Sequence, residues 1–117
     1  MKLATVVLFV LTAACQSGPP ISPLIAAARV GDAARIDDLV KSGADVNQRG
    51  GVNNWTPLMH AVHTKQPASV RALIASGADV NAAAGARGRD TALRLAEIEG
   101  YTDIAALLRD HGARPTP

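Results

Sequence analysis

Residues 56–81 read TPLMHAVHTKQPASVRALIASGADVN, and this stretch decides the fold. It contains a leucine, Leu58, followed nineteen residues later by a glycine, Gly77. Two further copies of this spacing run from Leu24 to Gly43 and from Leu93 to Gly112. Each copy also has an alanine three residues after its first leucine and a second leucine fifteen residues after it: Ala27, Ala61 and Ala96, and Leu39, Leu73 and Leu108. The repetition indicates stacked helix pairs, because small residues let helices approach and leucines fill the space between units.

Start and stop signals divide each copy into helices. Thr56 can cap a helix, and Pro57 suits the first helical position, where a missing N–H costs nothing. Gly43 and Gly77 are each preceded by serine and followed by Ala-Asp-Val-Asn. Because glycine adopts the left-handed conformation cheaply, these segments predict helix ends followed by tight turns.

Thr56-Pro57-Leu58, Ala61 and the two Gly-Ala-Asp-Val-Asn segments together resemble the ankyrin repeat, a unit of one turn and two antiparallel helices. The resemblance covers Ser22 to about Ala113. It implies an all-α fold, a short solenoid of three helix-turn-helix repeats with projecting hairpin loops. The implied repeat domain spans 23–113, with units of about 23–54, 55–89 and 90–113, and a tail at 114–117.

Two departures from the family pattern bear on the connecting segments. Lys65 stands where the family has a glycine between the two helices of a unit. The glycine-to-glycine period is 34 and then 35 residues, against about 33 in the family. The additional residues fall in 48–55 and 82–90, the segments that form hairpin fingers in ankyrin folds. Longer fingers favour contact with a partner there.

The N-terminus has the features of a secretory signal. Lys2 precedes an apolar run from Leu3 to Val10, and small residues follow, so 1–14 is a predicted signal peptide too short to span a membrane. The only cysteine, Cys15, resembles the lipidated cysteine of a bacterial lipobox, although Leu11 lies four residues before it instead of three. We expect lipidation of Cys15 and a tether over 15–22. Conventional signal-peptidase cleavage is the alternative.

The residue after the cysteine is Gln16, not aspartate. By resemblance to Gram-negative lipoproteins, this favours the periplasmic face of the outer membrane. The predicted mature chain has 103 residues, with eleven basic and ten acidic side chains, which is one domain without the basic face of a nucleic-acid-binding protein. Trp55 and Tyr101 are its only aromatic residues, so base-stacking platforms are absent.

No constellation of catalytic residues is present. His60 and His63 are three residues apart and His111 is distant, but a His-Glu-x-x-His pattern is missing. The run Gly85-Ala86-Arg87-Gly88-Arg89 suits a flexible finger tip better than a phosphate loop. We expect no enzymatic activity, no cofactor and no small-molecule substrate. The alternative function is a metal-binding or structural envelope lipoprotein that uses His60 and His63.

In ankyrin folds, partners contact the hairpin tips and the exposed face of each first helix. Carried over to this sequence, these positions are Val52, Asn53, Trp55, His63 and Thr64 in the middle unit, and Arg87, Gly88, Asp90, Ile98 and Glu99 in the last. We expect an exposed Trp55 to be the main anchor, since tryptophan dominates interface energetics. The alternative is that Trp55 folds back over the neighbouring finger.

Several arginines stand on successive fingers: Arg49, Arg87 and Arg89. They suit an acidic patch on a partner, and solvated loop charge is the competing interpretation. The sequence therefore predicts a protein-binding module of the bacterial cell envelope, attached to the membrane by a lipid. Two roles remain open: an immunity-type inhibitor of a secreted toxin, or an accessory factor of a periplasmic enzyme such as catalase.

Overall fold

The computed structural model describes residues 21–115 of the 117-residue chain. The predicted signal peptide, Cys15 and residues 16–20 of the predicted tether lie outside the described residues. Within 21–115 there are no extended strands, only helices, turns and two isolated β-bridges. The helices are α2 (Pro23–Val30), α3 (Ala33–Lys41), α4 (Pro57–His63), α5 (Pro67–Ala75), α6 (Ala92–Glu99) and α7 (Thr102–Asp110), with a 3-10 turn η1 (Val52–Asn54).

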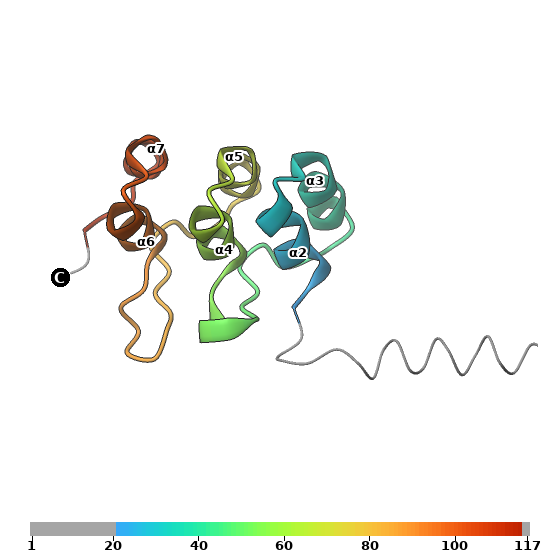
Figure 1. Ribbon diagram of the computed structural model, residues 1–117. Coiled ribbons are helices and arrows are strands. Elements are labelled where there is room, and N and C mark those ends of the chain that lie inside the picture. The colour runs from blue at the N-terminus through green and yellow to red at the C-terminus, as the bar shows by residue number, and fades with distance from the viewer. Residues whose placement is uncertain (1–20, 116–117) are drawn as a thin grey trace, which may run out of the picture.

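The helices form three antiparallel pairs that stack side by side (Figure 1). The first helices of the pairs, α2, α4 and α6, lie in one row, and the second helices, α3, α5 and α7, lie in a parallel row. Helix α4 packs against both α2 and α6. The prediction of an all-α solenoid of three helix-turn-helix repeats is confirmed.

The first helix of each pair begins with a hydroxyl cap. The side-chain oxygens of Ser22, Thr56 and Thr91 accept hydrogen bonds from the backbone N–H three residues later, at 3.1, 3.3 and 3.1 Å. Proline occupies the first helical position of α2 and α4, where it needs no donor. The start signal predicted at Thr56 and its counterpart at Thr91 therefore act as caps.

The second helix of each pair ends in a Schellman motif around the repeated glycine. Gly43, Gly77 and Gly112 have φ values of 103°, 95° and 92°. The N–H of the residue that follows each glycine donates to the carbonyl of the repeated leucine, Leu39, Leu73 or Leu108, at 3.0 Å. The fifteen-residue spacing between the two leucines of a unit therefore also places the carbonyl that closes the second helix.

The core runs through all three repeats between the two rows of helices. Ala27, Ala61 and Ala96 are buried where first helices approach one another. The side chains of Ile36, Leu73 and Leu108, contributed by the second helices, are fully buried. The two helices of each unit pack on one another, and contact with the neighbouring units completes the burial of their apolar faces.

Asparagine side chains join consecutive turns. The backbone N–H of Asp79 donates to Asn47 Oδ1 at 2.8 Å, and the N–H of Arg114 donates to Asn81 Oδ1 at the same distance. Asn81 Nδ2 also donates to the carbonyl of Gly112 at 3.1 Å. We call these bonds the asparagine clasps, and they fix the spacing of one unit against the next.

Residues 48–55 and 82–90 form two hairpins that project from the same side of the helix rows (Figure 1); we call them finger 1 and finger 2. The N–H of Gly50 donates to the Trp55 carbonyl at 3.0 Å and closes finger 1. Reciprocal bonds between Ala84 and Asp90, at 2.8 and 2.9 Å, close finger 2. The predicted fingers are present.

Lys65 takes a conformation that usually needs glycine. Its φ is 54°, whereas the equivalent Gly31 and Gly100 have 80° and 75°. The hydrogen bonds of a Schellman motif form nevertheless, from Lys65 N–H to the Val62 carbonyl at 3.0 Å and from Gln66 N–H to the Ala61 carbonyl at 2.9 Å. The repeat therefore keeps its backbone geometry at this position. Lys65 is strained as a result, because it has a Cβ and adopts the left-handed conformation.

We expect Lys65→Gly to raise the free energy of unfolding by about 0.5–1 kcal/mol, because glycine adopts this φ without steric conflict. Lys65 Nζ also lies 5.4 Å from the centre of the Tyr101 ring. Lys65→Ala is therefore the control, since it removes that contact and keeps the strain. Urea denaturation of the three proteins measures the difference. A Lys65→Gly protein no more stable than Lys65→Ala would contradict the prediction.

Candidate functional site

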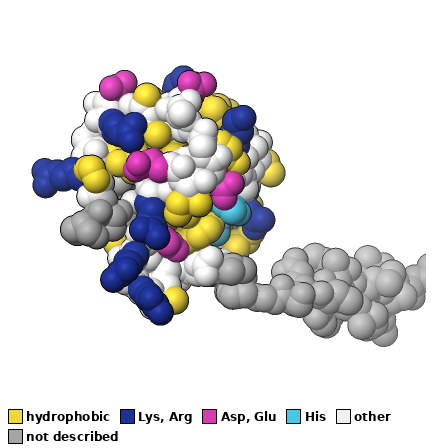
Figure 2. All heavy atoms as spheres, turned by 60° about the vertical axis from the view of Figure 1, so that its left-hand side comes forward, with side chains coloured by type: hydrophobic (Ala, Val, Ile, Leu, Met, Phe, Trp, Pro, Cys, Tyr) yellow, Lys and Arg dark blue, Asp and Glu magenta, His cyan; other side chains and the backbone are white. Residues whose placement is uncertain are grey.

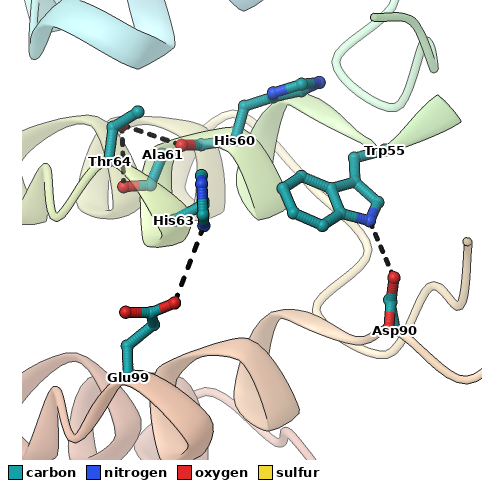
Figure 3. A network of polar contacts seen from close by, with 7 residues as sticks. All are labelled: Trp55, His60, Ala61, His63, Thr64, Asp90 and Glu99. Atoms are coloured by element: carbon teal, nitrogen blue, oxygen red, sulfur yellow. Dashed lines mark hydrogen bonds and ion pairs between the residues drawn. The ribbon is translucent and has the colours of Figure 1, made fainter. Parts of the chain in front are cut away.

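Trp55 lies at the base of finger 1, beneath the partner-facing surface predicted from the sequence. Only 8% of its surface is exposed. The indole Nε1–H donates to Asp90 Oδ2 at 3.0 Å, so the ring spans from finger 1 to finger 2 (Figure 3). The prediction that Trp55 is an exposed anchor is wrong, and the alternative, that it folds back over the neighbouring finger, is confirmed. A buried indole N–H needs an acceptor, and Asp90 supplies it.

Two histidines of α4 pack against the Trp55 ring. The ring centres of Trp55 and His60 are 5.6 Å apart, and those of Trp55 and His63 are 5.1 Å apart, both in edge-to-face geometry. These contacts hold the base of finger 1 against the helix row. Trp55 therefore sets the position of finger 1 with respect to both α4 and finger 2.

His60 is buried and forms a hydrogen bond with the backbone of finger 1. Its Nε2–H donates to the Gly50 carbonyl at 2.9 Å. Burial lowers the pKa of His60 below 6.5, and the positive charges of Arg29 and protonated His63 act in the same direction, while the hydrogen bond to Gly50 opposes them. The neutral ring is the form that fits this site.

This lowered pKa gives stability a dependence on pH. The unfolded chain takes up the His60 proton near pH 6.5, and the folded protein only at lower pH, so the unfolded state binds more protons in between. We expect the contribution of His60 to be fully present above pH 6.5 and to be lost as the pH falls through the folded pKa.

Urea denaturation of the wild type and of His60→Gln at pH 5, 6, 7 and 8 tests this expectation. Glutamine can donate to Gly50 but does not titrate. We expect the free energy of unfolding of the wild type to fall more steeply below pH 6.5 than that of the variant. Parallel profiles for the two proteins would assign the pH dependence to other groups.

His63 is the exposed member of the pair, with half of its side chain accessible. Its Nδ1 lies 4.0 Å from Glu99 Oε1 on α6 (Figure 3). The neighbouring Thr64 uses its hydroxyl internally, donating to the His60 carbonyl at 2.8 Å. His63 and Glu99 therefore present polar atoms to solvent, whereas the hydroxyl of Thr64 caps the end of α4.

One position of the repeat lies five residues after the first leucine of each unit, Leu24, Leu58 or Leu93. It is held by Arg29, His63 and Ile98, respectively. The next position is held by Val30, Thr64 and Glu99. We call these six residues the inner face, because His63 shows that this side of the first helices is turned toward the base of the fingers. Val30 and Ile98 are 71% and 64% exposed.

The fingers carry positive charge. Arg49 on finger 1 and Arg87 and Arg89 on finger 2 are exposed, and none forms an ion pair with another residue of the described range. Figure 2 shows Lys and Arg side chains along the lower edge of the molecule, the level at which the fingers project in Figure 1.

The structure separates the predicted site residues into two groups. Trp55, His63, Asp90 and Glu99 come together around the base of the fingers (Figure 3). Asn53, Arg87 and Gly88 are exposed on the fingers, and Ile98 is exposed on α6. Val52 belongs to η1 of finger 1, and its side chain is not among those described.

Arg29 and Val30 are missing from the sequence-predicted set, although they belong to the same surface. Their distance from Leu24 equals the distance of His63 and Thr64 from Leu58. This equal spacing from the repeated leucine could have identified Arg29 and Val30 from the sequence.

The histidines do not form a metal site with other side chains of the described part of the chain. No group of three or more His, Cys, Asp or Glu side chains within residues 21–115 is arranged to hold a metal ion. His60 directs its Nε2 to a carbonyl and His63 its Nδ1 toward a carboxylate.

Three stacked helix pairs with hairpins along one side define a helical repeat protein. The family model for ankyrin repeats (three copies) matches residues 7–84 and, in an overlapping match, residues 24–117. The chain belongs to the ankyrin repeat family. Members of this family are generally protein–protein interaction modules and are typically not enzymes.

Similar solved structures include the crystal structure of the human ASB11 ankyrin repeat domain. It superimposes with a TM-score of 0.70 at 29% sequence identity, over 80% of this chain and 41% of that chain. The present chain therefore spans less than half the length of that structure. A search of the curated proteins gives no match.

Proposed function

We propose that this protein is a non-enzymatic module of the bacterial cell envelope that binds another protein through its fingers and inner face. One observation carries the proposal: Val30 and Ile98, both large and aliphatic, are 71% and 64% exposed at neighbouring positions of the repeat in the first and last units. Exposed aliphatic side chains on the inner face, together with exposed arginines on the fingers, match the composition of protein interfaces.

The base of the surface is held in place before a partner arrives. Trp55 links finger 1 to Asp90 of finger 2 and packs on His63, and His60 is bonded to finger 1 at Gly50. A surface that is already ordered loses less conformational entropy on binding. The contacts within this network therefore raise the affinity indirectly, because they hold the binding surface in place. The direct contacts to the partner come from Val30, Ile98 and the finger arginines.

The envelope location rests on the N-terminal sequence. A short apolar segment followed by Cys15 supports export and lipidation, and several acyl chains on one cysteine would give stable attachment. Gln16 after the cysteine supports the outer membrane. No helix within residues 21–115 is long and apolar enough to cross a bilayer.

Two partners fit such a module: a secreted toxin that the protein would inhibit, or a periplasmic enzyme that it would assist. Rescue of cells from a co-expressed toxin would support the first role. Peroxide sensitivity of a deletion strain would support assistance to an enzyme such as catalase.

A pull-down from envelope extract tests the surface. We expect Ile98→Glu to lose the partner, because it places an unpaired carboxylate where an aliphatic contact forms. Ala106→Glu is the matched control, since Ala106 is exposed on α7, away from the inner face. Both variants should melt at the wild-type temperature. Equal recovery of the partner by both would remove Ile98 from the interface.

Labelling with a palmitate analogue tests the anchor. Wild-type protein should incorporate the label and fractionate with the outer membrane, whereas Cys15→Ser should remain unlabelled. Equal labelling of both proteins, or none of the wild type, would reject lipidation of Cys15.

A further inference from the structure

An open-sided pocket of about 530 Å³, which we call the cavity, lies between finger 2 and the last turn of the solenoid. Arg89 of finger 2 and Arg114 of the C-terminal segment both line it, together with Asn81, Ala83, Gly88, Thr91 and Pro115. None of the lining side chains is acidic or aromatic. Neither arginine forms an ion pair with any residue in the described range.

Arg114 reverses the charge of a repeated position. The Gly-Ala-Asp segments 43–45 and 77–79 correspond to Gly112-Ala113-Arg114 in the last unit. The backbone role is kept, because Arg114 N–H donates to Asn81 Oδ1 as Asp79 N–H donates to Asn47 Oδ1, both at 2.8 Å. In the first two units the aspartate accepts from the N–H two residues later. In the last unit a guanidinium lines the cavity instead.

Backbone hydrogen bonds support both walls of the cavity. Arg89 lies within finger 2, between the turn closed by Gly88 N–H and the Gly85 carbonyl, at 3.1 Å, and the reciprocal pair of Ala84 and Asp90. Asp90 directs Oδ2 to Trp55 Nε1. Arg114 is held by the asparagine clasp at Asn81. Hydrogen-bonded backbone segments from finger 2 and from the C-terminal segment therefore place two guanidinium groups without ion-pair partners at the same cavity.

We propose that this cavity binds an acidic peptide segment of a partner protein, with carboxylates paired to Arg89 and Arg114. Guanidinium groups form charge-assisted, bidentate hydrogen bonds with carboxylates. The volume of about 530 Å³ lies within the range of roughly 300–1,000 Å³ that ligand pockets span. The absence of lining aromatics disfavours a nucleic-acid base, which would need a stacking partner. The site lies at the end of the solenoid and does not depend on the proposed role of Val30 and Ile98.

The test is fluorescence anisotropy with a labelled, end-blocked pentapeptide of alternating glutamate and alanine. The matched probe carries glutamine in place of glutamate. We expect the wild type to bind the glutamate peptide and not the glutamine peptide. Arg89→Gln and Arg114→Asp should each weaken binding by about tenfold or more, as expected for loss of a charged hydrogen-bonding partner.

Arg87→Gln is the matched control, because Arg87 is exposed on the same finger but does not line the cavity. We expect its affinity to stay within about twofold of the wild type. Arg114→Asp restores the Gly-Ala-Asp motif and keeps the backbone N–H, so it should melt no lower than the wild type, and Arg114→Gln provides a second variant at this position.

Equal losses in Arg87→Gln and Arg89→Gln would show general charge attraction and overturn the site. Failure of the wild type to bind the glutamate peptide would overturn it as well. Tighter binding of tripolyphosphate than of the peptide, with the same dependence on Arg89 and Arg114, would overturn the assignment to carboxylates. A loss of partner binding in Ile98→Glu with unchanged peptide affinity would show that the two surfaces act independently.

Discussion

Trp55→Ala is expected to lower the free energy of unfolding by about 3–5 kcal/mol, the range for truncating a buried tryptophan. The substitution removes the packing of the indole on His60 and His63. It also leaves Asp90 without the Nε1–H donor at 3.0 Å. Because single domains are stable by only about 5–15 kcal/mol, we expect a large fall in the melting temperature.

Two controls separate packing from hydrogen bonding at Trp55. Trp55→Phe keeps an aromatic ring but loses the Nε1–H, and Asp90→Ala removes the acceptor. Each should cost about 1–3 kcal/mol, the range for a broken hydrogen bond that leaves a partner unsatisfied. Chemical denaturation measures all three variants. A midpoint for Trp55→Ala equal to that of the wild type would show that finger 1 is not held through this ring.

Leu73→Ala is expected to cost about 2–5 kcal/mol, because it opens a cavity in a fully buried part of the core. Leu73 belongs to the middle repeat, whose helix α5 packs against α4 and against α2 and α3 of the first repeat. Arg71→Ala, an exposed position on the same helix α5, is the control and should change stability by less than about 0.5 kcal/mol.

Thermal and urea denaturation measure Leu73→Ala and its control. Three repeats are close to the minimum for a stable solenoid, so a fraction of Leu73→Ala should already be unfolded at 25 °C. An unchanged melting temperature would contradict the assignment of Leu73 to the core.

The helices could be predicted from the sequence because their signals are local. Threonine caps, prolines at first helical positions and left-handed glycines act within four or five residues of themselves. The constant interval from Leu58 to Gly77 then gives the register of all three units. The structure adds that Leu39, Leu73 and Leu108 have a second task, since their carbonyls close the Schellman motifs.

The site was harder to predict because its contacts join residues one repeat apart. Trp55 and Asp90 each directly precede a capping threonine, Thr56 or Thr91. Stacking places these equivalent positions side by side, and the hydrogen bond between them follows. The expectation of an exposed Trp55 considered finger 1 by itself, whereas the hydrogen bond of Trp55 to Asp90 also requires finger 2. The cavity at Arg89 and Arg114 was missed for a related reason, since it forms only when the last turn is aligned with finger 2.

The asparagine clasps have a mechanical consequence. The bonds from Asn47 to Asp79 and from Asn81 to Arg114 follow one another along the axis of stacking. A pulling force along that axis would act on these bonds in series. Single-molecule stretching should therefore record separate small rupture events, one per turn, before the helices themselves unravel.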